Sequence, residues 1–200
     1  CHLRQGSVQV REGETVYRRQ LLGSIGLSGK TEFPHLHLSV RYQDTVVDPF
    51  VGPGAEVGCG VKGKPLWEPK LMADLVYRPS GVLSSGFTDR VPTKNQVVSG
   101  EHRHKFLGRN ASNLVFWVMI YGVQPGDEES LRIIMPDGHV LVQKTGQPAK
   151  KHKIQWFTYS GKRAQGSWMP GEYRGEYKLV RKTESGGKVV LQSTTAVRVE

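Results

Sequence analysis

The chain has 200 residues, of which 37% are hydrophobic, and it carries a formal net charge of +10. This length allows one large domain or two small ones, and no run of about 18 apolar residues occurs, so a membrane-spanning helix is not expected. Its 24 glycines and 11 prolines favour strands and turns over long helices. The chain begins at Cys1 without a methionine. We expect it to be a piece of a longer protein, so a missing signal peptide says nothing about targeting.

The positive charge is concentrated in the second part of the chain. Residues 1–75 contain nine lysines and arginines against eight acidic residues, whereas residues 76–200 contain 19 against 10. Such a field favours anionic partners, for example cell-wall polymers, lipid headgroups or nucleic acid, although a solvated basic surface without a partner is the simpler alternative. Because no aromatic-rich nucleic-acid motif accompanies the charge, we expect no nucleic-acid partner.

The chain contains two cysteines, Cys1 and Cys59. Neither belongs to a Cys-x-x-Cys pair, so a zinc knuckle is not expected. One disulfide, which would suit an oxidising compartment, and two buried free thiols both remain open.

The first segment is predicted to form short antiparallel strands joined by tight turns. Residues 8–11 alternate between apolar and polar, and Glu12-Gly13-Glu14 follows them as a turn signal. Gly23, Gly26 and Gly29 are spaced three apart, but no phosphate-loop motif surrounds them. We expect these glycines to mark bulges and places where two strands approach closely.

The stretch 33–41 alternates and places two histidines on one side. Pro34 lacks an N–H group, which suits the start of a strand. Side chains at positions i and i+2 of a strand share a face, so His35 and His37 are expected to point the same way, roughly 6.5–7 Å apart. The opposite face is expected to be buried and carries Leu36, Leu38 and Val40. A pair of surface histidines without a function is the alternative.

The order of these short motifs resembles the second half of the lysostaphin-type zinc metallopeptidases, which are cell-wall endopeptidases. The resemblance covers about the first 50 residues. The motifs that carry it are, in chain order, Cys1-His2-Leu3, Gly6-Ser7-Val8, Val10-x-Glu12-Gly13-Glu14-x-Val16, Gln20-Leu21-Leu22-Gly23, Gly26-Leu27-Ser28-Gly29, Pro34-His35-Leu36-His37 and Val47-Asp48-Pro49.

The resemblance implies a Zn²⁺ ion bound by His37, with His2 and His35 as catalytic residues beside the attacking water and the oxyanion. A catalytic zinc takes three protein ligands, acidifies its bound water and polarises the scissile carbonyl. A histidine beside it can take up a proton and return it, and another can stabilise the developing negative charge. The implied substrate and partner is peptidoglycan or another anionic polymer, in the cell envelope, periplasm or outside the cell.

The resemblance also implies that the zinc site is incomplete in this chain. The family takes its other two ligands from a His-x-x-x-Asp motif before the position of His2, and that motif occurs nowhere in this sequence. We therefore expect weak zinc binding and no activity of this chain alone. The alternative function is a non-catalytic module that binds peptidoglycan or regulates a hydrolase. A lipoyl or biotinyl carrier is a further alternative, but Lys30 lacks the flanking residues of the carrier lysine.

The remaining chain is predicted to consist of a linker and a second domain, so that the protein is all-β. Residues 1–54 form the peptidase part, a partial lysostaphin-type antiparallel sheet. Residues 55–75 form the linker, with one or two helical turns near its end. Residues 76–200 form a basic immunoglobulin-like β-sandwich, because strand patterns and turn residues alternate every 8–12 positions. We expect His102 and His104 to lie in a solvated loop. Four aromatic residues are expected in the core or, alternatively, on a sugar-binding face: Trp156, Phe157, Tyr159 and Trp168.

Overall fold

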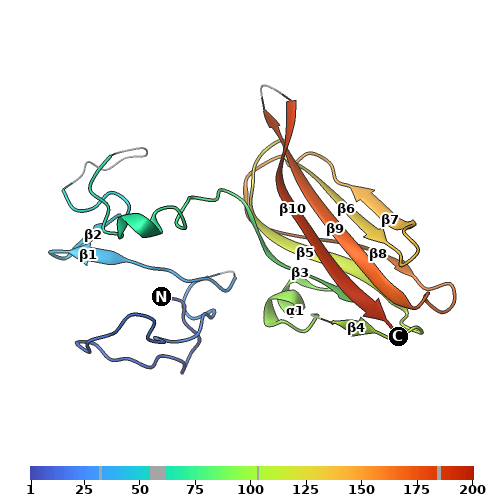
Figure 1. Cartoon of the computed structure of the whole chain (residues 1–200), viewed down its shortest axis with the longest axis horizontal. Helices are drawn as coiled ribbons and strands as arrows, with labels where there is room; N and C mark the ends of the chain where they lie inside the picture. Colours follow the sequence, from blue (N-terminus) through green and yellow to red (C-terminus); the bar gives the residue numbers. More distant parts are fainter. Residues whose placement is uncertain (32, 55–61, 103, 184–185) are drawn as a thin grey trace. The chain divides into compact units, whose positions relative to one another are not determined.

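The computed structural model describes residues 1–31, 33–54, 62–102, 104–183 and 186–200. These residues contain ten strands, one short α-helix and one 3-10 turn, so the protein is all-β as predicted (Figure 1). No helix among them is long and apolar enough to cross a bilayer. The chain divides into two compact units, Cys1–Tyr77 and Arg78–Glu200, which we describe separately.

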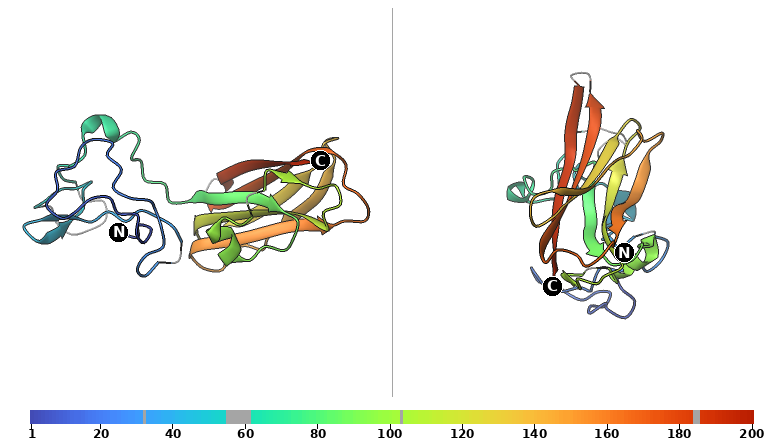
Figure 2. Two further views of the ribbon diagram at one scale, coloured as in Figure 1. Left: turned by 90° about the horizontal axis from the view of Figure 1, so that it is seen from below. Right: turned by 90° about the vertical axis from the view of Figure 1, so that its right-hand side faces the viewer.

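The second unit consists of two β-sheets that pack face to face (Figure 2). One sheet has the strand order β3-β5-β8 and is antiparallel. The other has the order β4-β10-β9-β6-β7, and only its β4–β10 pair is parallel. The strands are β3 (Gly81–Thr88), β4 (Phe106–Leu107), β5 (Asn113–Val123), β6 (Glu128–Ile134), β7 (Val140–Thr145), β8 (Lys153–Arg163), β9 (Gly171–Thr183) and β10 (Gly186–Val199).

Strand β5 lies in the centre of the three-stranded sheet and is buried on both faces. Its inner side chains pack against the five-stranded sheet, and they are Leu114, Phe116, Val118 and Ile120. On the outer face Trp117 and Met119 pack with Val97. Val97 lies on α1 (Lys94–Ser99), which begins with a capping box at Thr93. Covering both faces explains why residues 114–120 are all apolar in the sequence, because neither face is left to water.

Asp137-Gly138 is a sequence signal for a β-hairpin, and the turn between the antiparallel strands β6 and β7 forms at this pair. Gly138 follows Asp137 and has φ = 87°, a left-handed backbone that glycine adopts without a steric penalty. The Gly138 N–H donates to the Met135 carbonyl over 2.9 Å, and the Met135 N–H donates to the His139 carbonyl over 2.9 Å. These bonds close the hairpin.

A buried ion pair joins β9 to the turn between β5 and β6. Arg181 donates to both carboxylate oxygens of Asp127 over 2.8 Å, and Asp127 is 2% exposed. Arg181 also donates to the Ser80 hydroxyl over 2.9 Å. The hydrogen bond to Asp127 raises the pKa of Arg181 above its usual value. Both charges are therefore satisfied, as a buried pair requires.

One prediction for this unit is wrong. His102 was expected in a solvated loop, but it is 4% exposed. Its Nδ1 lies 3.2 Å from the Thr88 hydroxyl, and its carbonyl accepts a hydrogen bond from the Trp117 indole over 3.0 Å. The charged residues beside it in the sequence indicated exposure, whereas the packing of Trp117 buries it. His104 is exposed as expected.

The first unit has little regular structure. It contains β1 (Val40–Tyr42), β2 (Thr45–Val47) and the 3-10 turn η1 (Pro69–Leu71), so the strands expected at residues 8–11 and 33–39 do not form. None of its described hydrophobic side chains is buried. Leu36 and Leu38 are 63% and 57% exposed, which corrects the expectation of a buried face. No described residues of this unit cover the side chains of Leu36 and Leu38.

The packing of the two sheets predicts the effect of adding one methyl group. A Cβ on Gly175 of β9 would lie closer to three atoms of the Phe116 ring than van der Waals contact allows. We expect Gly175→Ala to lower the free energy of unfolding of the second unit by about 1–3 kcal/mol. Urea denaturation followed by tryptophan fluorescence measures this.

Gly108→Ala is the matched control, because nothing lies within 4 Å of a Cβ at that position. It should change the free energy of unfolding by less than about 0.5 kcal/mol. Equal effects of the two substitutions would contradict the tight packing of β9 on β5.

Candidate functional site: a histidine cluster in the first unit

Backbone pairing places the start of the chain beside the His-x-His motif. The Cys1 nitrogen donates to the His37 carbonyl over 2.6 Å, and the His37 N–H donates to the Cys1 carbonyl over 3.5 Å. Two residues that exchange both hydrogen bonds form the closely bonded pair of an antiparallel ladder. This pairing places His2 next to the segment that contains His35 and His37.

The three imidazoles lie together. The ring centroid of His2 is 4.8 Å from that of His35 and 5.5 Å from that of His37. In a regular ladder His2 would face away from the side chains of His35 and His37, because alternate residues point to opposite faces. His2 instead has φ = 61°, in the left-handed region. This departure interrupts the alternation and allows its ring to lie against both of the others.

Two of the rings are oriented by backbone carbonyls. The Nδ1 of His2 lies 2.7 Å from the Ser28 carbonyl, and the Nδ1 of His35 lies 2.9 Å from the Phe33 carbonyl. A carbonyl only accepts hydrogen bonds, so these contacts assign the proton to Nδ1 in both rings, and the Thr31 hydroxyl lies a further 3.2 Å from the Nδ1 of His35. In the neutral rings Nε2 is then the nitrogen with the free lone pair. His37 is exposed, and its ring has no hydrogen bond among the described residues.

A second backbone pairing holds His2 in place. The Gly26 N–H donates to the His2 carbonyl over 3.0 Å, and the Arg4 N–H donates to the Ser24 carbonyl over 2.7 Å. A Cβ on Gly26 would overlap the backbone of Arg4. The expectation that the spaced glycines include a close approach of two chain segments is confirmed at Gly26.

The cluster does not by itself complete a zinc site. Imidazole nitrogens are suitable zinc ligands. Within the described ranges, however, no group of three or more His, Cys, Asp or Glu side chains is arranged to hold a metal ion. Cys1 is a free, exposed thiol, and Cys59 lies outside the described residues. The three rings therefore have the right chemistry but do not supply a full set of ligands.

The arrangement is suited to proton transfer. Because Nδ1 of His2 and of His35 is held by a carbonyl, each ring can accept a proton only at Nε2, and when protonated it donates from that atom. The roles of Ser28 and Phe33 could not be predicted from the sequence. They act through carbonyl groups, which every residue has.

Comparison with known proteins identifies no family. No family model matches this chain, and no curated protein matches it. Several solved structures show a weak similarity to this chain, and three of them are 9–15% identical in sequence. The C-terminal domain of Wzt is 9% identical, with 76% of this chain and 82% of that domain covered and a TM-score of 0.43.

The other two structures are more distant. The CARDB domain of a Pyrococcus furiosus protein, in complex with di-metal ions, is 15% identical over 48% of this chain and 81% of that one, with a TM-score of 0.32. An endonuclease/exonuclease/phosphatase from Beutenbergia cavernae is 12% identical, with 60% of this chain and 35% of that chain covered and a TM-score of 0.27. Likenesses of this size say nothing about activity.

These comparisons correct the interpretation of the first 50 residues. The motif order predicted membership of the lysostaphin-type peptidases, but none of these three structures is such a peptidase and no family model matches. The assignment to that family is therefore wrong. It rested on motifs of a few residues, rich in glycine and turn residues, which recur wherever short extended segments pair.

The close approach at Gly26 predicts how the cluster can be broken. We expect Gly26→Ala to displace the His2 ring from His35 and His37, because the added methyl group forces residues 24–26 away from Arg4 and breaks the Gly26–His2 hydrogen bond that holds His2 in place. In NMR spectra the nuclear Overhauser effects between the His2 ring and the other two rings should disappear. Gly108→Ala, in the second unit, should leave them unchanged. Persistence of these signals in Gly26→Ala would contradict the pairing.

Proposed function

We propose that the histidine cluster serves in the zinc-dependent hydrolysis of peptide bonds in peptidoglycan. His37 is the metal ligand, and His2 and His35 are the residues that transfer protons. The observation that supports this proposal is the approach of the His2 ring to within 4.8 and 5.5 Å of the other two imidazoles. The remaining metal ligands would have to come from groups other than the described cluster.

The proposal assigns distinct roles to the three rings. A bound zinc ion would acidify a water molecule and polarise the scissile carbonyl. His37 suits the ligand role because its ring is exposed and free of hydrogen bonds among the described residues. His2 or His35 takes up the proton of the water at Nε2 and returns it to the leaving amine. The other ring, once protonated, donates from Nε2 to the developing oxyanion.

The charge of the second unit supports an anionic polymer as the partner. Residues 76–200 carry nearly all of the excess positive charge, and a surface of one sign concentrates partners of the other sign. Peptidoglycan stems carry free carboxylates and lie in the cell envelope. We therefore propose that the protein acts there, in the periplasm or outside the cell.

A non-catalytic function is the second candidate. The described residues do not supply a full set of zinc ligands, which favours a module that binds peptidoglycan or regulates a hydrolase. The two candidates differ in whether the histidines are needed for bond cleavage or only for the structure of the unit.

The incomplete ligand set predicts weak metal binding by this chain. We expect calorimetric titration with Zn²⁺ to give a dissociation constant weaker than micromolar, because a catalytic zinc normally takes three protein ligands. His37→Ala should remove most of this binding, whereas His152→Ala, at an exposed histidine of the second unit, should not. Micromolar or tighter binding of one zinc per chain would overturn the assignment of an incomplete site.

The hydrolase proposal is tested in the protein as expressed from its own gene. Zinc content and the release of new amino groups from purified peptidoglycan are measured together. We expect His37→Ala to lose both, whereas His35→Ala should retain zinc and lose activity by about 10²–10⁴-fold, the usual contribution of a general acid–base. His152→Ala is the control. If the protein binds peptidoglycan without cleaving it, and neither variant changes this binding, the enzyme proposal is wrong and the binding module is supported.

A further inference from the structure

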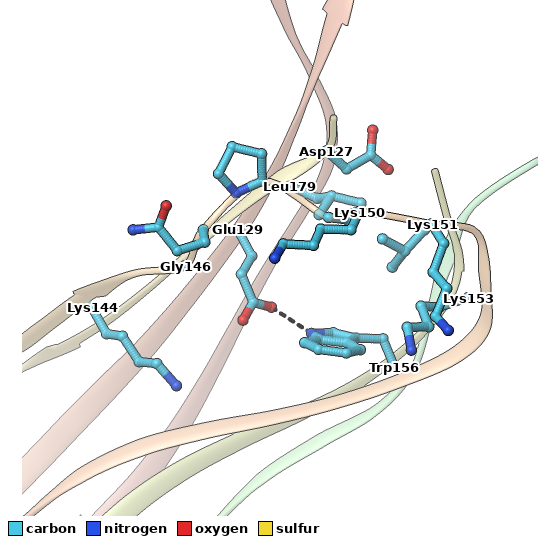
Figure 3. A pocket seen from close by; sticks show the side chains of 13 residues that line it. Asp127, Glu129, Lys144, Gly146, Lys150, Lys151, Lys153, Trp156 and Leu179 are labelled. Carbon is cyan, nitrogen blue, oxygen red and sulfur yellow. Dashed lines mark hydrogen bonds between the residues drawn. The ribbon is translucent and has the colours of Figure 1, made fainter. Parts of the chain in front are cut away.

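A pocket opens at one edge of the sandwich in the second unit, and none of its lining residues belongs to the histidine cluster. It lies where β7 and β8, the edge strands of the two sheets, are joined by the loop of residues 146–152 (Figure 3). Its volume is about 450 Å³. Sites for small organic molecules typically measure about 300–1,000 Å³, so the pocket is of a suitable size.

The loop over the pocket is held by backbone hydrogen bonds. Gly146 N–H donates to the Glu129 carbonyl over 2.9 Å, and Ala149 N–H donates to the Asp127 carbonyl over 2.9 Å. The Gly126 N–H donates to the Ala149 carbonyl over 2.8 Å. A Cβ on Gly146 would lie 2.9 Å from Cγ of Glu129, so a larger residue there would displace the Glu129 side chain. The pocket is therefore formed before any ligand enters, which lowers the entropic cost of binding.

The acidic groups of the pocket wall already have hydrogen-bond partners. Glu129 is 8% exposed and accepts from the Trp156 indole and the Thr158 hydroxyl over 2.9 Å, and from the Tyr177 hydroxyl over 3.3 Å. Burial and the charge of Glu129 raise the pKa of Tyr177, so its hydroxyl remains a donor. Asp127 is paired with Arg181. Figure 3 shows the Trp156 indole directed at Glu129 across the pocket.

The rest of the inner wall is apolar, and the rim is cationic. The wall is completed by Val123, Pro148, Ala149 and Leu179. The rim contains Gln147 and four lysines, Lys144, Lys150, Lys151 and Lys153. The Lys153 ammonium lies 5.7 Å from the centre of the Trp156 ring. Within the part of the chain that the structure describes, Glu129 forms no ion pair. The four lysines of the rim therefore give the pocket a net positive charge even when the Glu129 carboxylate is counted.

We propose that this pocket binds an amphipathic organic anion, with an apolar body against Trp156 and Leu179 and an acid group at the lysine rim. A sugar fits less well. Its hydroxyl groups would lose water inside the pocket, where Glu129 and Asp127 are already engaged by protein donors, and unpaired buried hydroxyls are costly. An apolar body has no such cost, and the rim lysines can pair with one carboxylate, sulfonate or phosphate.

The test uses the full chain with decanoate as the probe and 1-decanol as its uncharged counterpart. Each of the four tryptophans gives one indole N–H signal in an NMR spectrum, and the Trp156 signal is identified by its loss in Trp156→Phe. We expect decanoate to shift the Trp156 signal and to leave the buried Trp117 and Trp168 signals in place. Decanol should bind at least about tenfold more weakly, and added salt should weaken decanoate binding.

Charge-matched variants test the rim. Lys150→Gln/Lys151→Gln should raise the dissociation constant for decanoate about tenfold, because two exposed charge contacts together contribute about one order of magnitude. Lys162→Gln/Lys188→Gln removes the same charge elsewhere on the unit and should change the dissociation constant for decanoate by less than about twofold. Three outcomes would each overturn the proposal. Decanol could bind as tightly as decanoate, or the two double variants could have equal effects. Glucuronate could also displace decanoate at a lower concentration than octanoate does.

Discussion

The burial of β5 on both faces is the constraint on which the second unit depends. One face requires the five-stranded sheet and the other requires α1 with Phe157, because an apolar strand left open to water on either side would lose the free energy gained by burial. Gly175 shows how tightly the first contact is made, since its lack of a side chain provides the space for Phe116. The first unit has no buried strand of this kind among the residues described, and backbone hydrogen bonds and turns hold it instead.

This difference between the units explains the character of the two candidate sites. The histidine cluster depends on backbone geometry: the Cys1–His37 pairing, the left-handed conformation of His2, and the carbonyls that orient two of the rings. Such a site is accessible to solvent and depends on a few hydrogen bonds. The pocket beneath residues 146–152 depends on packing, because Glu129 of one sheet receives hydrogen bonds from Trp156 and Thr158 of the other.

The two sites also differ in the ligands that their chemistry favours. Imidazoles with free Nε2 atoms suit proton transfer and metal ions, whereas an apolar pocket with a lysine rim suits an anion with an apolar body. The proposals are independent, since no residue is shared between the cluster and the pocket. Failure of either one therefore leaves the other standing. The basic charge of residues 76–200 is compatible with both an anionic polymer outside the pocket and a small anion within it.

The sequence by itself predicted the all-β class, a hairpin at Asp137-Gly138, and a central strand over residues 113–121, for which a short buried helix was the alternative, because these follow from local apolar patterns and turn chemistry. It also predicted that His35 and His37 act together. Only the tertiary structure decided that His102 is buried, that Leu36 and Leu38 are exposed, and that Glu129 and Trp156 meet across two sheets. The physical reason is that burial and carbonyl hydrogen bonds depend on which distant segments pack together. The local sequence of a segment does not specify which other segments it will contact.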